Sequence, residues 1–158
     1  MLNWIAQIDR YAERLFGYFS PALLLITRLW VALVFFKAGL VKLDSWSSTL
    51  YLFGYEYHVP FLPPEVAAYL GTGIELFIPV FLAFGLLTRP VAAFLFVYNI
   101  MAVVSYPVLW KTGFYDHKLW GLMILINTVW GAGVFSLDYV INHRGTLFNR
   151  YKHSGNFK

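Results

Sequence analysis

The chain has 158 residues, of which 59% are hydrophobic, 20% are aromatic and only 13% are charged, with a mean hydropathy of +0.62. Soluble domains average about 25% charged residues, so this composition argues against a water-soluble globular protein. The formal net charge of +4 fits basic segments beside a membrane, and no nucleic-acid partner is expected. Without cysteine, the chain excludes disulfides, thiolate ligands and any cysteine-based cofactor.

Four apolar stretches are long enough to cross a bilayer, which takes about 20 residues each. They predict an all-α integral membrane protein with a four-transmembrane-helix bundle over residues 21–140. Residues 1–20 place apolar side chains opposite charged ones at helical spacing, which predicts an amphipathic helix in the membrane interface. Residues 141–158 form a basic tail. The four predicted spans are 22–43, 67–87, 91–108 and 119–135.

The distribution of Lys and Arg near the span ends predicts the orientation in the membrane, because these residues favour the cytoplasmic side. Both termini and the turn at 88–90 share one side, and the loops at 44–66 and 109–118 share the other. Seven basic residues against three place both termini in the cytoplasm of a bacterial inner membrane. The seven are Arg10, Arg14, Arg89, Arg144, Arg150, Lys152 and Lys158, and the three are Lys42, Lys111 and Lys118.

The external loop 44–66 is too aromatic for a solvated linker. It is predicted to form a helical segment on the outer mouth of the bundle, stopped by Pro60, Pro63 and Pro64, where it would act as a lid. Histidines and carboxylates on the external side are the residue types that bind a divalent metal, but their spacing matches no ligand motif, and no metal site is predicted. The external candidates are Trp46, Glu56, His58, Asp116 and His117.

Four polar residues from four different spans fall in nearly one layer of the predicted membrane. Counted inward at about 1.5 Å per residue, Glu75 lies about 12 Å deep, Asn99 and Asn127 about 13 Å, and Lys37 about 9 Å. A charged group at the bilayer centre costs at least about 2.5–3.5 kcal/mol, so it usually has a partner and often a purpose. Glu75 is therefore either one half of a structural ion pair or a group that exchanges protons or binds a polar head such as a quinone ring. The asparagines favour interhelical hydrogen bonding.

Three basic residues of the first span cannot all face one site. Arg28 and Lys42 are 14 residues apart and project to nearly the same side of a helix, whereas Lys37 points about 180° away. Two arrangements stay open. Either Lys37 extends outward while Arg28 and Lys42 line the interior, or Lys37 pairs with Glu75 and Arg28 reaches the headgroups.

These residues resemble the DoxX family of small four-helix membrane proteins. The resemblance rests on Arg28, on the run Phe36-Lys37-Ala38-Gly39-Leu40-Val41-Lys42, on Glu75 and on Gly85-Leu86-Leu87-Thr88-Arg89. A narrower likeness, to DoxX-type proteins that accompany bufferin-like copper-binding peptides, rests on further short runs. They are Ser45-Trp46-Ser47-Ser48-Thr49-Leu50, Leu52-Phe53, Glu56-Tyr57, Val59-Pro60, Leu62-Pro63-Pro64 and Ser136-Leu137-Asp138.

The resemblance implies a component of a larger assembly and assigns no catalytic residue. The first expectation is a membrane subunit of a quinone-linked redox or oxidative-stress complex, in which Glu75 exchanges protons and Arg28 or Lys42 steadies an anion. The second is a non-enzymatic membrane partner of copper or oxidative-stress peptides or enzymes, with its contact surface on the external loop or the tail. In either role the expected partners are the lipid bilayer and other membrane or secreted proteins, and the chain is at most one subunit of an oxidoreductase.

Overall fold

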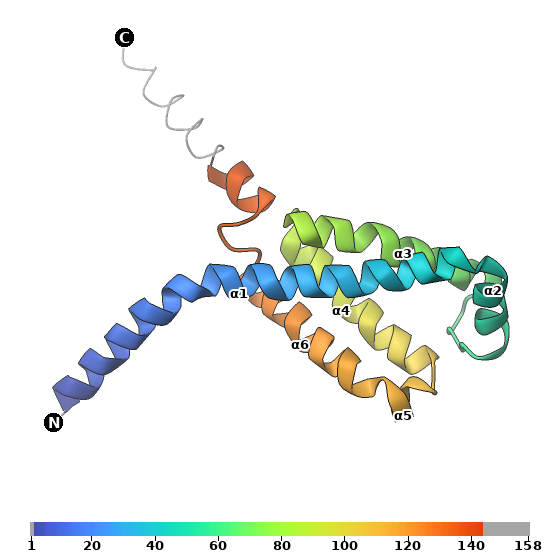
Figure 1. Cartoon of the computed structure of the whole chain (residues 1–158), viewed down its shortest axis with the longest axis horizontal. Coiled ribbons are helices and arrows are strands. Elements are labelled where there is room, and N and C mark those ends of the chain that lie inside the picture. Colours follow the sequence, from blue (N-terminus) through green and yellow to red (C-terminus); the bar gives the residue numbers. More distant parts are fainter. Residues whose placement is uncertain (1, 144–158) are drawn as a thin grey trace, which may run out of the picture.

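The computed structural model describes residues 2–143, and within them it contains helices and no strand (Figure 1). The last described residues, 137–143, are also helical. The predicted tail 141–158 therefore lies, beyond residue 143, outside the described residues. The named helices are α1 (Leu2–Asp44), α2 (Trp46–Tyr55), α3 (Pro64–Phe84), α4 (Thr88–Ser105), α5 (Leu109–Thr112) and α6 (Phe114–Trp130).

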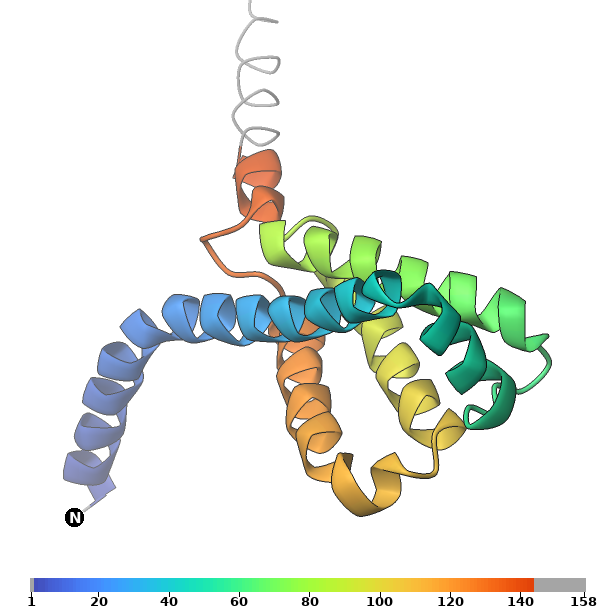
Figure 2. The same cartoon turned by 45° about the vertical axis from the view of Figure 1, so that its right-hand side comes forward.

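Helix α1 has 43 residues and continues through Pro21, so residues 2–20 and the predicted first span belong to one helix. At about 1.5 Å per residue α1 is about 64 Å long, twice the hydrocarbon thickness of a bilayer. Proline inside a helix removes a backbone hydrogen bond and bends the axis. The blue N-terminal part of α1 points away from the other helices (Figures 1 and 2).

Helices α3 and α4 form an antiparallel pair whose ends are set by proline and glycine. Pro64 occupies the first turn of α3, where its missing N–H costs nothing. Gly85 ends α3 in the left-handed conformation with φ +66°, and a Cβ there would collide with Nη1 of Arg28. Both helices therefore begin three residues before the predicted spans, at residues 64 and 88 instead of 67 and 91.

Helix α6 begins five residues before the start of the predicted fourth span, at residue 114 instead of 119, and ends five residues before its end, at 130 instead of 135. It has 17 residues, which corresponds to a length of about 26 Å. Gly131 and Gly133 both have positive φ, of 80° and 69°, and they turn the chain out of the helix. Residues 131–136, of which 131–135 were predicted as the end of the fourth span, form this bent connection to the helical residues 137–143.

Helix α1 contacts α3 and α6, and α4 contacts α6 and α3, with α4 and α6 running obliquely to α1 and α3 (Figure 2). Helices α1 and α3 are in close contact at Gly39, where a Cβ would lie 2.9 Å from the side chain of Leu76. Small residues at such contacts let helices in membranes pack closely. The core at the centre of this arrangement consists of Val31, Phe35, Leu82, Ala92, Leu95 and Ile124.

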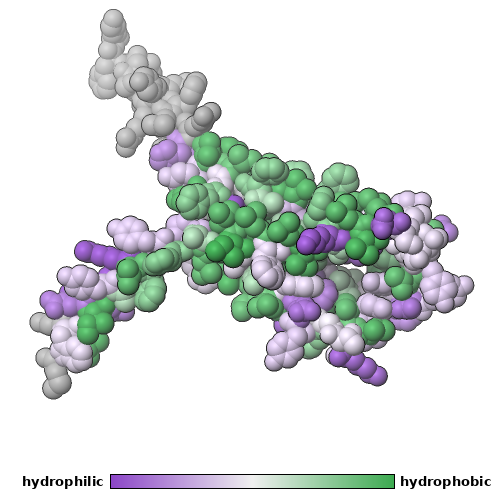
Figure 3. All heavy atoms as spheres, in the orientation of Figure 1, coloured by the Kyte–Doolittle hydropathy of each residue, from purple (hydrophilic) through white to green (hydrophobic). Residues whose placement is uncertain are grey.

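Among residues 2–143, three helices are long and apolar enough to cross a membrane: α1 from Trp4 to Asp44, α3 and α4. Hydrophobic side chains cover most of the face of the packed helices shown in Figure 3, and hydrophilic ones gather around α2 and along the N-terminal part of α1. An apolar outer surface on helices of this length is the surface that lipid contacts. The fourth predicted span is not among the three, because α6 has only 17 residues.

Candidate functional site

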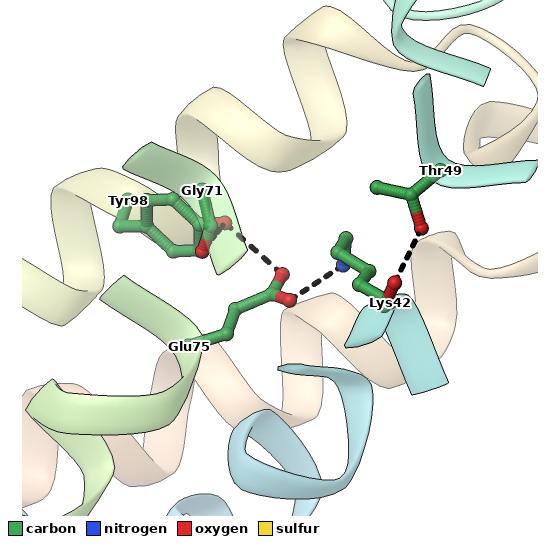
Figure 4. Close-up of polar contacts among 5 residues, drawn as sticks. All are labelled: Lys42, Thr49, Gly71, Glu75 and Tyr98. Carbon is green, nitrogen blue, oxygen red and sulfur yellow. Dashed lines mark hydrogen bonds and ion pairs between the residues drawn. The ribbon is translucent and has the colours of Figure 1, made fainter. Parts of the chain in front are cut away.

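A buried ion pair joins α1 to α3. The Nζ atom of Lys42 donates to Oε2 of Glu75 at 2.5 Å, with the two side chains 17% and 7% exposed (Figure 4). The hydroxyl of Tyr98, on α4, lies 3.0 Å from Oε1 of Glu75 and 3.2 Å from the carbonyl oxygen of Gly71. The backbone of Lys42 is fixed in turn by Thr49, whose hydroxyl donates to its carbonyl oxygen. Three helices thus hold one carboxylate in a defined position.

The ion pair opens on a cavity of about 470 Å³ among α1, α2, α3, α4 and α6. Sites for small molecules are typically clefts of about 300–1,000 Å³ with apolar walls and a few placed polar groups. This cavity fits that description, since its polar side chains are few. The apolar wall includes Val34, Phe35, Phe53, Val59, Leu62, Leu70, Ile74, Met101 and Trp120, and the polar groups are Lys42, Glu75, Tyr57, Tyr98, Ser105, Tyr106 and His117.

Stacked aromatic rings form one end of the cavity. Tyr57 stacks on Phe53 and on Tyr106, with ring centroids 4.6 and 4.5 Å apart. The hydroxyl of Tyr106 donates to Glu56 at 2.9 Å, which ties the end of α4 to the segment after α2. Burial, together with the negative charge of Glu75, raises the pKa of Tyr57 to about 12. Tyr57 therefore presents a protonated hydroxyl at neutral pH.

Asn99 and His117 pair with each other across α4 and α6, outside the ion pair. Nδ2 of Asn99 donates to the carbonyl oxygen of His117 at 3.0 Å, and Oδ1 of Asn99 lies 2.8 Å from Nδ1 of His117. His117 also lines the cavity, whereas Asn99 lines only a second groove of about 600 Å³ on the outer side of α4 and α6. The His117 ring thus lies between the two.

The predicted polar layer is not one site. Glu75 pairs with Lys42, Asn99 with His117, and Nδ2 of Asn127 donates to Oγ1 of Thr27 at 3.1 Å. Lys37 is exposed on the far side of α1. This is the first of the two arrangements left open by the sequence, with Lys37 directed outward and Lys42 inward. Counting about 1.5 Å per residue estimates only how deep each residue lies in the membrane. The four residues project from their helices in different directions, so they do not meet.

Arg28 is fully buried, 1% exposed, at the opposite end of the packed helices from Lys42, and it does not line the cavity. Its guanidinium donates to the carbonyl oxygens of Ala132 and Phe135, at 3.1 and 2.6 Å. These carbonyls belong to the bent connection after α6, where the backbone is not helical and no N–H group of a following helical turn within residues 2–143 donates to them. Arg28 therefore stabilises the path of residues 131–136 across the end of α1.

Asp138 anchors the same region to the start of α4. Its carboxylate accepts from the backbone N–H groups of Leu87 and Thr88, both at 2.8 Å. A carboxylate at a helix N-terminus satisfies donors that have no helical partner and interacts well with the helix dipole. Burial opposes ionisation of Asp138, but these N–H groups and the charge of Arg28 outweigh it and lower its pKa.

A protein-family model matches the part of the chain that contains the ion pair. The family model DoxX matches residues 23–107, just over half of the chain. The chain belongs to the DoxX family. The matched region contains α2, α3, α4 and most of the packed part of α1, and with them Lys42, Glu75 and Tyr98. No curated protein and no solved structure matches the chain. The DoxX match together with the long apolar helices makes this a multi-pass membrane protein that contacts lipid.

The external candidates of this DoxX protein lie in different surroundings. Trp46 packs on Tyr69 with ring centroids 4.6 Å apart, and Glu56 accepts from Tyr106. His58 and Asp116 are exposed. Among residues 2–143 no group of three potential metal-ligating His, Asp or Glu side chains comes together.

Two residues of the cavity, Tyr57 and Tyr98, and Asp138 at the start of α4 were not predicted as site residues from the sequence. Tyr98 and Tyr57 are polar only at the hydroxyl, and in a chain with 11 tyrosines nothing marks them out. Asp138 stood only in the narrower likeness, and its partners are 50 residues away in sequence. One signal could have pointed to Tyr98: it stands directly before Asn99, so two polar groups occupy adjacent positions of an otherwise apolar helix.

Proposed function

We propose that this DoxX protein is a membrane subunit of a quinone-linked redox complex, and that its cavity binds the quinone head. The observation that carries the proposal is the Lys42–Glu75–Tyr98 cluster at the wall of an otherwise apolar cavity. Ionisable groups inside membranes are costly and typically mark substrate or proton pathways. Here the ionisable groups Lys42 and Glu75 line a cavity that is large enough for a ligand.

The donors and acceptors in the cavity suit a ring with carbonyl or hydroxyl substituents. Nζ of Lys42 has three protons and uses one on Glu75, so two stay available for an acceptor. Tyr57 adds a protonated hydroxyl, and the aromatic walls suit a flat apolar ring. A bound quinone supplies the two-electron chemistry, and the electrons come from a redox partner subunit. Glu75, held by Lys42 and Tyr98, is the group placed to exchange protons.

The proposal includes a particular membrane arrangement. With α6 and residues 131–136 as a fourth span, the chain is a four-helix membrane bundle, and the Lys and Arg distribution places both termini in the cytoplasm of a bacterial inner membrane. The cavity then lies toward the external side. Residues of α2 and the following loop, Phe53, Tyr57, Val59 and Leu62, line it and act as its lid. The exposed apolar side chains before Pro21 lie in the cytoplasmic interface.

The test is quinone binding by the full chain in lipid nanodiscs, followed by tryptophan fluorescence, since Trp120 lines the cavity. A hydrogen bond from a charged group contributes about 1.5–3 kcal/mol, so Lys42→Met is expected to weaken binding about 10- to 150-fold. Lys37→Met is the matched control, because it removes the same charge from the exposed side of the same helix. Equal binding by wild type and Lys42→Met would refute the role of the ion pair.

A second candidate function is a non-enzymatic membrane partner for copper or oxidative-stress peptides or enzymes. One observation favours it: several aromatic side chains of the 46–63 segment face outward, including Tyr55 at 73% and Phe61 at 103% exposure. Photo-crosslinkers at positions 55, 58 and 61 in cells test it. A specific crosslinked protein would support a contact surface for a protein partner there. Capture of lipid alone would mean that these aromatic side chains contact the membrane, and would contradict this candidate function.

A further inference from the structure

His117 is fixed in one tautomer by its partner. The carbonyl oxygen of His117 can only accept, so the side of the Asn99 amide that faces it must be the NH₂ group. The other side of the same amide, Oδ1, then faces Nδ1 of His117 at 2.8 Å. Because Oδ1 is an acceptor, Nδ1 must carry the proton. In a neutral imidazole Nε2 is then an acceptor.

Nε2 of His117, the acceptor atom of the ring, is the nitrogen that is available to a ligand in the cavity. The Nδ1 edge of His117 faces Asn99, and Asn99 lines the outer groove and not the cavity. The Trp120 ring contacts His117 edge to face, at 4.7 Å between centroids, and it holds the imidazole in position. Nε2 has no hydrogen-bond partner among residues 2–143. The cavity thus has a charged donor, Lys42, on α1 and a neutral acceptor on α6.

We infer that His117 makes the cavity selective for the reduced, hydroxyl-bearing form of its ligand. This inference rests on the proposed function. A quinone has only acceptor oxygens, and none of them can donate to Nε2 of His117. The corresponding quinol has hydroxyls on opposite sides of the ring, so one hydroxyl oxygen accepts from Lys42 while the opposite hydroxyl donates to His117. Binding the quinone would leave a buried acceptor unpaired, which disfavours that form.

The experiment measures the affinities of a decyl-substituted benzoquinone and of its quinol for the full chain in nanodiscs, without oxygen and at pH 8. The expected result is quinol binding about tenfold tighter, which equals about 1.4 kcal/mol and is the size of one net hydrogen bond. His117→Asn retains a donor toward Asn99 and removes the Nε2 acceptor, so the quinol preference should disappear. His58→Asn removes an exposed histidine and should retain the preference.

A second measurement reports the tautomer of His117 in the wild-type protein. Nitrogen NMR of histidine-labelled protein, with the His117 signals assigned by their loss in His117→Asn, should show protonated Nδ1 and unprotonated Nε2. The quinol should shift the Nε2 signal. Equal affinities for the two forms, tighter quinone binding, or a proton on Nε2 would overturn the inference and leave the proposed function standing. If neither the quinone nor the quinol binds, both the inference and the proposed function are overturned.

Discussion

The Lys42–Glu75 pair should show strong energetic coupling in a double-mutant cycle. Both side chains are largely buried, at 17% and 7% exposure, and they come from different helices. Removing one partner of a buried pair costs about 3–5 kcal/mol, because the other charge stays buried without compensation. Lys42→Met should lie at the lower end, about 3 kcal/mol, since Glu75 keeps its hydrogen bond with Tyr98.

The other variants of the cycle separate charge from packing. Glu75→Gln keeps an acceptor and loses the charge, and it should cost about 1–2 kcal/mol. The double variant Lys42→Met/Glu75→Gln contains no unpaired charge and should lie within about 1 kcal/mol of wild type. Lys37→Met, on the exposed side of α1, should change the free energy of unfolding by less than about 0.5 kcal/mol.

The assay is reversible unfolding of the full chain in mild detergent by increasing dodecyl sulfate, monitored by tryptophan fluorescence and circular dichroism. A coupling energy of at least about 2 kcal/mol is the expected outcome. The reasoning is refuted if Lys42→Met is no more harmful than Lys37→Met, or if the double variant loses the sum of the two single effects.

Three further predictions concern packing and titration. Gly39→Leu should separate α1 from α3 and destabilise the fold by about 2–3 kcal/mol, whereas Gly17→Leu, with nothing within 4 Å, should be neutral or stabilising in the same unfolding assay. Asp138→Asn should lower the free energy of unfolding by about 1 kcal/mol. Because the pKa of Asp138 is lowered in the folded protein, this difference should be constant from about pH 5 to 8 and vanish as the pH falls through the lowered pKa. A difference that persists at the lowest pH would contradict the role of the charged carboxylate. In a spectrophotometric titration Tyr57→Phe should leave the tyrosinate absorbance at about pH 10.5 unchanged, because burial raises the pKa of Tyr57 to about 12; a loss of one tyrosine's share at that pH would contradict the burial of Tyr57.

The sequence predicted the class of structure because the signals for membrane helices are long and local. Runs of about 20 apolar residues and the 14-residue separation of Arg28 and Lys42 depend only on the period of one helix. Boundaries were less exact, because they depend on short-range features such as Gly113 before α6 and Gly131 after it. His117, expected in an external loop, lies one turn inside α6 for this reason.

The composition of the site was predicted less well, because it depends on how helices face each other. Counting residues gives the depth of Lys37 and Glu75 but not their azimuth, and Lys42, about one turn further along α1, is the residue that reaches the carboxylate. Asn127 and Asn99 share that depth and still bind different partners. Nothing local in the sequence encodes a contact between residues 33 positions apart, such as Lys42 and Glu75.

Native mass spectrometry of the full chain, gently extracted from the membrane of its own host, tests the central claim most directly. The account predicts that wild-type protein and Lys37→Met retain the mass of a quinone or quinol, and that Lys42→Met/Glu75→Gln, which should fold, loses it. Retention of phospholipid alone by all three proteins, or equal retention of quinone by the double variant, would contradict the account.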